Sequence, residues 1–278
     1  MSTATYLDEI LAVHRAGSAA DARDVGALLA DAGRCPPPRP FVAALNRSDG
    51  LAVIAEIKRR SPSRGDLDPG LDPAAVAGEY EAGGAACLSV LSDAAFFGGS
   101  ADDVARARAA CTVPVLRKDF TVADADVADA RLMGADAVLL IVAALSDAEL
   151  VHLLGLARSL GLDALVEAHD EREVGRAVDA GADLVGVNQR DLTTFAVDHE
   201  RALRVVAAIP GGVVAVAESG IRDGADARRL ADAGFRAVLV GETLMRAGDR
   251  RAALAELVGH PVRAAVRDGA GRPGSDGG

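Results

Sequence analysis

The stretch DAGADLVGV (179–187) contains the local pattern on which the predicted fold depends. A helical segment ends in a small residue and a glycine, the chain turns, and a short run of apolar residues follows. The same pattern occurs in EAGGAACLSV (81–90), LMGADAVLL (132–140) and DAGFRAVLV (232–240). Four aligned glycines lie 50, 47 and 53 residues apart: Gly84, Gly134, Gly181 and Gly234.

Four further apolar runs lie between these copies: LAVIAEI (51–57), VPVLRKDF (113–120), LDALVEA (162–168) and VVAVAES (213–219). Each of the eight runs precedes an Ala-rich stretch with helical periodicity. Continuous apolar strands alternating with amphipathic helices indicate a parallel sheet covered by helices. Eight units of about 25 residues each fit a closed barrel better than an open sheet. The predicted fold class is therefore α/β, a (βα)8 TIM barrel.

The two ends of the chain differ from this repeat. Residues 1–50 contain two amphipathic stretches and then the breaker CPPPRP (35–40), so we expect pre-barrel helices that cap one end of the barrel. Residues 51–260 form the predicted catalytic barrel. The last segment, 261–278, is too poor in apolar residues to offset its ordering entropy and is predicted to be disordered.

Composition and charge exclude several classes of partner. Half of the 278 residues are hydrophobic but only 3% are aromatic, so the core must consist of Ala, Val and Leu. The net charge of −11 argues against a nucleic acid or an anionic membrane surface as partner. A phosphorylated small molecule remains possible, because it needs only a few local donors.

Sequence features also suggest where the protein resides. Cys35, Cys87 and Cys111 form no CxxC pair and are interpreted as reduced thiols. The start, MSTATYLDEI, lacks a basic segment followed by an apolar run, and the apolar stretch 135–145 is too short to span a bilayer. We expect a cytoplasmic protein, and a monomer because no strongly apolar exposed patch is evident.

Polar side chains close most of the predicted strands at one end. They are Glu56 and Lys58, Arg117 and Lys118, Glu167, Asn188 and Arg190, and Glu218 and Ser219. Residues two apart along a strand share a face, so Glu56 and Lys58 point the same way, as do Asn188 and Arg190. Each residue alone is compatible with a salt bridge at the barrel rim. Together, at the carboxyl ends of the strands, they predict an active site.

Two glycine-containing turns predict a phosphate site. Ser219 and Gly220 follow the seventh strand, and Gly241 follows the eighth, each before a helical start. In barrels of this class, backbone N–H groups after these two strands commonly bind phosphate. A glycine there lets the phosphate approach the backbone closely.

The histidines do not indicate a metal site. None of the five forms an HxH or HxxxH pattern or a cluster with carboxylates along the sequence, so no metal or other cofactor is expected. His169, two residues after Glu167, is interpreted as facing solvent or capping the following helix.

The polar strings identify a family resemblance that runs from about Tyr6 to Leu257. The chain resembles indole-3-glycerol-phosphate synthase in IAEIKRRSPSRG (54–65), LSVLSDAAFFGGS (88–100), VLRKDF (115–120), GADAVLLIVA (134–143), LVEAHD (165–170), GVNQRDL (186–192), VAESGI (216–221) and VGETLM (240–245). The resemblance implies that the substrate is 1-(2-carboxyphenylamino)-1-deoxyribulose 5-phosphate. The indole ring closes with loss of CO2 and water, a step of tryptophan biosynthesis.

The resemblance also implies a role for each site residue. Lys118 would be the general acid that protonates the ketose oxygen, and Glu167 the acid/base partner in the dehydration. Lys58 would bind the phosphate and orient the carboxylated ring. Lys118 and the substrate hydroxyls would be held by Glu56, Asn188, Arg190 and Glu218. The anionic groups would contact Ser61, Ser219, Gly220 and Gly241. The ring pocket would be lined by Phe97, Phe120, Leu139, Ile141 and Leu192.

One position departs from the family pattern. Glu242 follows Gly241 where members often have a small hydroxyl residue. Because an inward carboxylate would repel a phosphate, we expect Glu242 to contribute only its backbone N–H to the ligand site.

Two alternatives to this function remain. An aldolase-like enzyme on the same fold could use Lys118 or Lys58 to form a Schiff base. A binding or regulatory paralogue could keep the phosphate site without turnover. Carboxylates around the lysines argue against the first, and the retained Lys118 and Glu167 argue against the second.

Overall fold

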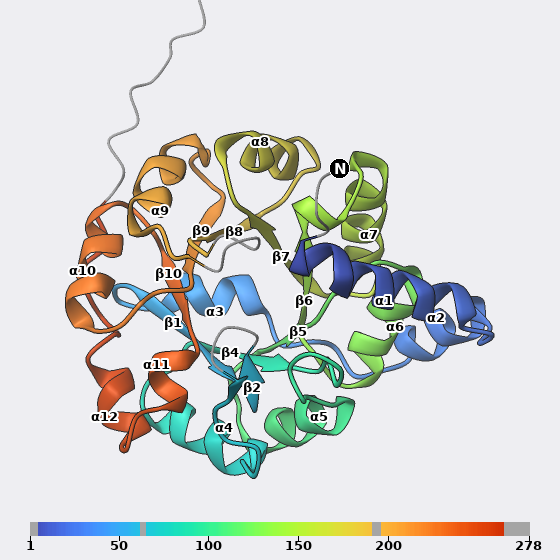
Figure 1. Ribbon diagram of the computed structural model, residues 1–278, viewed down its shortest axis with the longest axis horizontal. Coiled ribbons are helices and arrows are strands. Elements are labelled where there is room, and N and C mark those ends of the chain that lie inside the picture. Colours follow the sequence, from blue (N-terminus) through green and yellow to red (C-terminus); the bar gives the residue numbers. More distant parts are fainter. Residues whose placement is uncertain (1–4, 62–64, 191–195, 264–278) are drawn as a thin grey trace, which may run out of the picture.

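A computed structural model of the chain describes residues 5–61, 65–190 and 196–263 and contains the predicted closed parallel barrel (Figure 1). Its eight strands are β1 (Ala52–Ile57), β4 (Cys87–Leu91), β5 (Val115–Lys118), β6 (Ala137–Ile141), β7 (Asp163–Ala168), β8 (Leu184–Asn188), β9 (Val214–Glu218) and β10 (Ala237–Val240). They pair in chain order, and β10 closes the barrel against β1. The fold predicted from the repeat is confirmed.

Helices form an outer ring around these strands (Figure 1). They are α4 (Pro73–Ala82), α5 (Ala101–Ala110), α6 (Asp124–Leu132), α7 (Asp147–Ser159), α8 (Glu171–Asp179), α9 (His199–Val205), α10 (Gly224–Asp232), α11 (Glu242–Met245) and α12 (Arg250–Ala255), with short 3-10 turns η1 (Val142–Ala144) and η2 (Val206–Ala208). Among the described residues, no helix is both long and apolar enough to cross a membrane. The three cysteines, all described, are unpaired.

The repeat glycines have a common conformational role. Gly181 lies just beyond the end of α8 with a φ of 89°, and its N–H donates to the carbonyl of Val178, while that of Ala182 donates to Ala177. This is a Schellman ending, in which the left-handed residue favours glycine because it has no Cβ. Gly84, Gly134 and Gly234 also have positive φ at the corresponding turns. The sequence repeat therefore reflects the turn by which each of these helices leads into the next strand.

The N-terminal segment contacts both ends of the barrel, not one as the sequence suggested. It forms α1 (Tyr6–Ala20), α2 (Val25–Gly33) and α3 (Phe41–Arg47). Helix α3 crosses behind the barrel centre in Figure 1, where Phe41 and Leu45 are fully buried. Helix α1 instead places Tyr6 and Ile10 at the cavity formed by the carboxyl ends of the strands.

A buried carboxylate links the N-terminal segment to the barrel strands. Asp136, which is fully buried, accepts hydrogen bonds from the backbone N–H groups of Arg39 and Val115 and pairs with Arg108. At the other end of the chain, the N–H of Arg263 donates to Ala231. The remainder of the predicted disordered tail, 264–278, lies outside the described residues.

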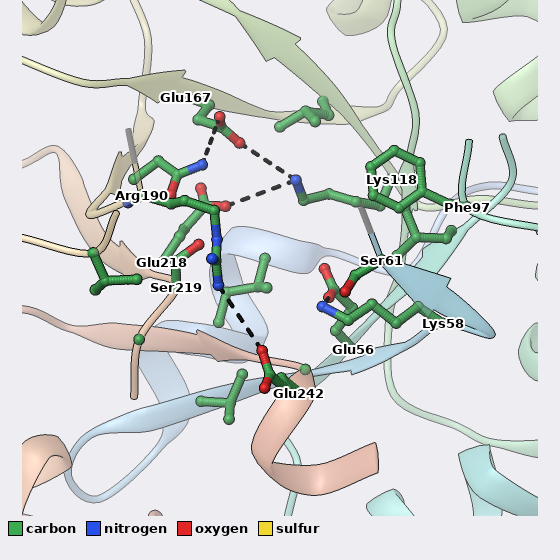
Figure 2. Close-up of a pocket in the computed structure, with 18 of the residues that line it drawn as sticks. Glu56, Lys58, Ser61, Phe97, Lys118, Glu167, Arg190, Glu218, Ser219 and Glu242 are labelled. Carbon is green, nitrogen blue, oxygen red and sulfur yellow. Dashed lines mark hydrogen bonds and ion pairs between the residues drawn. The ribbon is translucent and has the colours of Figure 1, made fainter. Parts of the chain in front are cut away.

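Two short strands in the loop after β1 were not predicted. They are β2 (Arg60–Ser61) and β3 (Gly65–Asp66), which pair antiparallel. The hairpin brings Ser61 toward the end of the barrel where the polar strand ends lie, as Figure 2 shows.

Candidate active site

The carboxyl ends of the strands surround a cavity of about 530 Å³. This volume is within the usual range for small-molecule sites. Every predicted site residue that the structure describes lines it: Glu56, Lys58, Ser61, Phe97, Lys118, Phe120, Leu139, Ile141, Glu167, Asn188, Arg190, Glu218, Ser219, Gly220, Gly241 and Glu242. Leu192 lies outside the described residues. Arg117, the remaining strand-end residue, does not line the cavity; it is buried and pairs with Asp119.

Strand register explains why these side chains meet. Lys118 lies beside Leu91, Glu167 beside Ile141 and Asn188 beside Glu218, all in the last or second-last positions of their strands. The last side chains of neighbouring parallel strands that point inward therefore converge above the packed barrel interior.

Two lysine–glutamate pairs form the polar floor of the cavity (Figure 2). Lys118 Nζ lies 3.3 Å from Glu167 Oε2 and 3.9 Å from Glu218 Oε2. Lys58 Nζ lies 2.6 Å from Glu56 Oε1. Asn188 donates from Nδ2 to Glu167 Oε1 across 3.0 Å, which holds that carboxylate in place.

Burial and neighbouring charges shift the pKa values of Lys118, Glu167 and Glu218, which are called the Lys118 group below. Burial acts to lower the pKa of Lys118, but the charges of Glu167 and Glu218 outweigh burial and raise that pKa above its ordinary value. Burial acts to raise the pKa of Glu167, yet the positive charge of Lys118 brings it below the ordinary range. For Glu218, burial dominates, the charge of Glu167 adds to it, and the pKa is raised well above the usual value.

Lys118 is therefore held protonated and Glu167 ionised, while burial favours the neutral form of Glu218. This division among the glutamates was left open by the sequence. A protonated Lys118 can donate a proton or a hydrogen bond but cannot attack a carbonyl. Its charge state argues against Schiff-base chemistry at this position.

Glycines shape the other end of the cavity. A Cβ at Gly241 would lie 2.3 Å from Glu56 Oε1 and 2.9 Å from Lys58 Nζ, so no side chain fits there. Ser219 and Gly220 both have positive φ, 69° and 74°. Gln189, which sequence reasoning missed, fixes this turn by donating from its side chain to the Ser219 carbonyl. Its signal was available: Gln189 directly follows the strand-end Asn188.

Glu242 is placed differently from the expectation. Its carboxylate Oε2 lies 4.0 Å from Arg190 Nη2, and both residues line the cavity. Figure 2 shows the side chain turned toward Arg190. The prediction that only its backbone faces the ligand site was therefore wrong: the carboxylate lies near two guanidinium groups, that of Arg190 and that of Arg246, whose Nη1 is 3.7 Å from Oε1.

Apolar side chains form the wall opposite the glycines. Phe97 and Phe120 lie with ring centroids 6.5 Å apart, next to Leu139 and Ile141. Helix α1 completes this wall with Tyr6, Leu7 and Ile10, which the sequence analysis did not assign. Their contact with the barrel is between residues far apart in sequence and leaves no local signal.

A histidine and two aspartates brace the aromatic wall. His14 Nε2 lies 2.9 Å from Asp93 Oδ2 and 3.9 Å from Asp119 Oδ1, and its ring packs 5.2 Å from that of Phe120. Asp93 also accepts the backbone N–H groups of Phe96 and Phe97. This spacing is compatible with metal ligands. However, Asp119 already pairs with Arg117, so we interpret the group as a hydrogen-bond network.

Comparison of the sequence with known protein families identifies a match. A family model described as indole-3-glycerol phosphate synthase matches residues 7–257. The chain belongs to the indole-3-glycerol phosphate synthase family. The predicted family membership is confirmed, and the match includes α1 together with the whole barrel.

Two bacterial relatives are similar over most of their length. The chain is 54% identical to indole-3-glycerol phosphate synthase 2 of Streptomyces coelicolor, over 82% of this chain and 88% of that one. It is 50% identical to the indole-3-glycerol phosphate synthase of Mycobacterium ulcerans, over 93% and 95%.

More distant solved structures share only the fold with this family member. A thiamine phosphate pyrophosphorylase from Pyrococcus furiosus matches with a TM-score of 0.57 and 19% identity, over 76% of this chain and 95% of that one. A mandelate oxidase matches with a TM-score of 0.53 and 21% identity, over 75% and 70%.

Proposed function

We propose that this chain closes the indole ring of 1-(2-carboxyphenylamino)-1-deoxyribulose 5-phosphate, releasing CO2 and water. The observation that carries the proposal is the charged Lys118 amine, held between Glu167 and Glu218 beside an apolar wall. The carboxylated ring would pack against Phe97 and Phe120, and the phosphate would contact the glycine turns at the other end of the cavity.

The reaction needs an acid first and a base later. Lys118 donates a proton to the ketose oxygen, which makes that carbon electrophilic enough for attack by the aromatic ring. Loss of CO2 restores the aromatic ring. In the dehydration Glu167, ionised at neutral pH, accepts a proton from the substrate and passes it to the departing hydroxyl, which leaves as water. Glu218, held neutral by burial, supplies a hydrogen-bond donor beside them. The products balance the substrate without a further reactant, so no cofactor is proposed.

Binding groups occupy separate parts of the cavity. Lys58, which lies beside Gly241, attracts the phosphate and the ring carboxylate. Glu56 holds the Lys58 amine and Asn188 holds the Glu167 carboxylate. Arg190 contacts a substrate oxygen. All of these residues come from one chain, so we propose that the protein acts as a monomer. We also propose that it acts in the cytoplasm.

The direct test is to mix the purified protein with the synthetic substrate and follow indole fluorescence. We expect turnover that is saturable in substrate and absent when the protein is omitted. A borohydride-stable adduct between Lys118 and the ketose, detected by mass spectrometry, would contradict the general-acid role. An absence of indole product with a correctly folded protein would refute the proposed function.

Glu242→Gln should lower the KM of the phosphorylated substrate by up to about five-fold and leave kcat unchanged. The substitution removes a negative charge next to the Gly241 backbone, and a partly exposed charge contact is worth up to about 1 kcal/mol. Steady-state kinetics measure both constants. Glu256→Gln, the same change outside the cavity, is the control. A higher KM would show instead that Glu242 is needed to hold Arg190.

A further inference from the structure

His169 is a buried neighbour of the proposed base, Glu167, and is not among the residues that line the cavity. It comes directly after β7 and two residues after Glu167. The side chain is only 15% exposed, so it does not face solvent as the sequence suggested. Asp170, not His169, caps the following helix by accepting the N–H of Glu173.

Two carboxylates face the two ring nitrogens of His169. Nδ1 lies 3.0 Å from Glu173 Oε2, and the same oxygen accepts the backbone N–H of His169 across 2.8 Å. Nε2 lies 3.6 Å from Glu167 Oε1 and has no hydrogen-bond partner among the described residues. Glu173, in the first turn of α8, thus clamps the ring with its second nitrogen toward Glu167.

This arrangement favours the doubly protonated ring. A neutral imidazole carries one N–H and one lone pair, so it would place a lone pair against one of the two carboxylates. An imidazolium offers an N–H to both. Burial acts to lower the pKa of His169, but the hydrogen bond to Glu173 and the charge of Glu167 raise it above the ordinary value.

We propose that His169 is a positioning residue for ring closure: fixed by Glu173, it places a positive charge beside Glu167 that keeps this base ionised and in place. The proposal rests on the proposed function of Glu167. It adds a second cation, which lies near Oε1 of Glu167, whereas Lys118 lies near Oε2. Lys118 alone could not supply this charge throughout the reaction, because it gives up its proton to the ketose oxygen.

The other charged groups near this pair come from four different elements. Glu167 also faces Lys118 on β5 and Glu218 on β9, together with the neutral amide of Asn188 on β8. His169 faces Glu173 on α8 and feels Arg201 on α9, whose charge opposes its protonation. Burial favours the neutral form of Glu218, and Lys118 and His169 are the two cations that favour the ionised form of Glu167.

The first test is the dependence of kcat/KM on pH. Replacing His169 by glutamine removes the cation, so the pKa of Glu167 should rise and the acidic limb should move upward by about one pH unit or more. His152→Gln is the matched control, because that ring is exposed and contacts only Asp124 among the described residues. An equal loss of rate at every pH, without movement of the limb, would show a merely structural role and overturn the proposal.

Glu173→Gln gives a second variant that keeps the ring in place. The amide oxygen still accepts from Nδ1, but the charge that favours the imidazolium is gone. We expect the limb to move in the same direction by a smaller amount. An unchanged limb in both Glu173→Gln and His169→Gln would refute the inference.

A binding-independent measurement separates this inference from the proposed function. The chain has five histidines, so ring titrations can be followed by NMR. Coupling between two sites is reciprocal, so Glu167→Gln should lower the pKa of His169 by as much as His169→Gln raises that of Glu167. Loss of this coupling contradicts the positioning role even if indole is formed. Its presence without indole formation contradicts only the function.

Discussion

Replacing Lys118 by methionine should reduce kcat for indole formation by about 10²–10⁴-fold, the usual contribution of a positioned acid. Methionine keeps the length and apolar part of the side chain but cannot donate a proton. The phosphate end of the cavity is formed by other residues, so binding of the product should be weakened by less than about ten-fold. Single-turnover fluorescence measures the chemical step, and a titration with indole-3-glycerol phosphate measures binding.

Two outcomes would contradict this assignment. Turnover within a few-fold of the unsubstituted protein would show that another group is the acid. Equal losses in binding and in kcat would show that Lys118 mainly holds the substrate. Because the substitution removes the buried cation that Glu167 and Glu218 share, thermal unfolding should be measured in parallel, and a folded variant is required before the rates are compared.

The barrel could be predicted because its signals are local. Gly181 and its three repeat partners mark the end of a helix, and each apolar run begins a few residues later. Periodicity then predicts which residues face inward, and the strand ends predict that Lys118 and Glu167 lie at one cavity, as they do. These deductions need only the covalent order of the chain and the two-residue period of a strand.

The parts that could not be predicted depend on contacts between distant residues. His14 meets Asp93 across 79 positions, and no periodicity connects α1 with the loop after β4. The orientation of Glu242 depends on Arg190, which precedes it by 52 residues. His169 is an intermediate case: it shares a face with Glu167, but only the position of Glu173 shows that the ring turns inward.

The charge states of Glu167 and Glu218 also could not be predicted from the sequence. Glu167 and Glu218 are equally buried, with side chains 2% exposed, yet their pKa values move in opposite directions. Lys118 Nζ lies closer to Glu167 than to Glu218. Glu167 also faces the charge of His169 and accepts the Asn188 hydrogen bond, whereas burial dominates at Glu218. Such differences of a few tenths of an ångström follow from packing, not from residue order.

Packing at Gly186 explains how Glu218 reaches this position. Gly186 lies on β8, next to Glu167 on β7, with its Cα facing the barrel interior. A Cβ there would lie 2.0 Å from Glu218 Oε1 and 3.2 Å from Leu165 Cδ1. The space that a side chain would occupy is therefore filled by the Glu218 carboxyl group.

Gly186→Ala should consequently lower kcat by about 10²-fold or more, although alanine has no chemistry of its own. The methyl group must displace the Glu218 carboxyl by about 1 Å, and misplacements of this size can cost about 10²-fold in rate. KM should change little, because the glycine turns and the apolar wall are not touched. Steady-state kinetics with the indole fluorescence signal measure both constants.

The matched control is Gly175→Ala, which adds the same methyl group on the exposed face of α8 where nothing lies within 4 Å. It should leave kcat unchanged and stabilise the helix by about 0.5–1 kcal/mol.

Glu218→Asp in the Gly186→Ala background provides the decisive comparison, because the shorter side chain leaves room for the methyl group. If displacement of Glu218 causes the loss, the two substitutions together should cost less than the sum of their separate effects. Strict additivity would show that Gly186 acts through Leu165 and the barrel core instead.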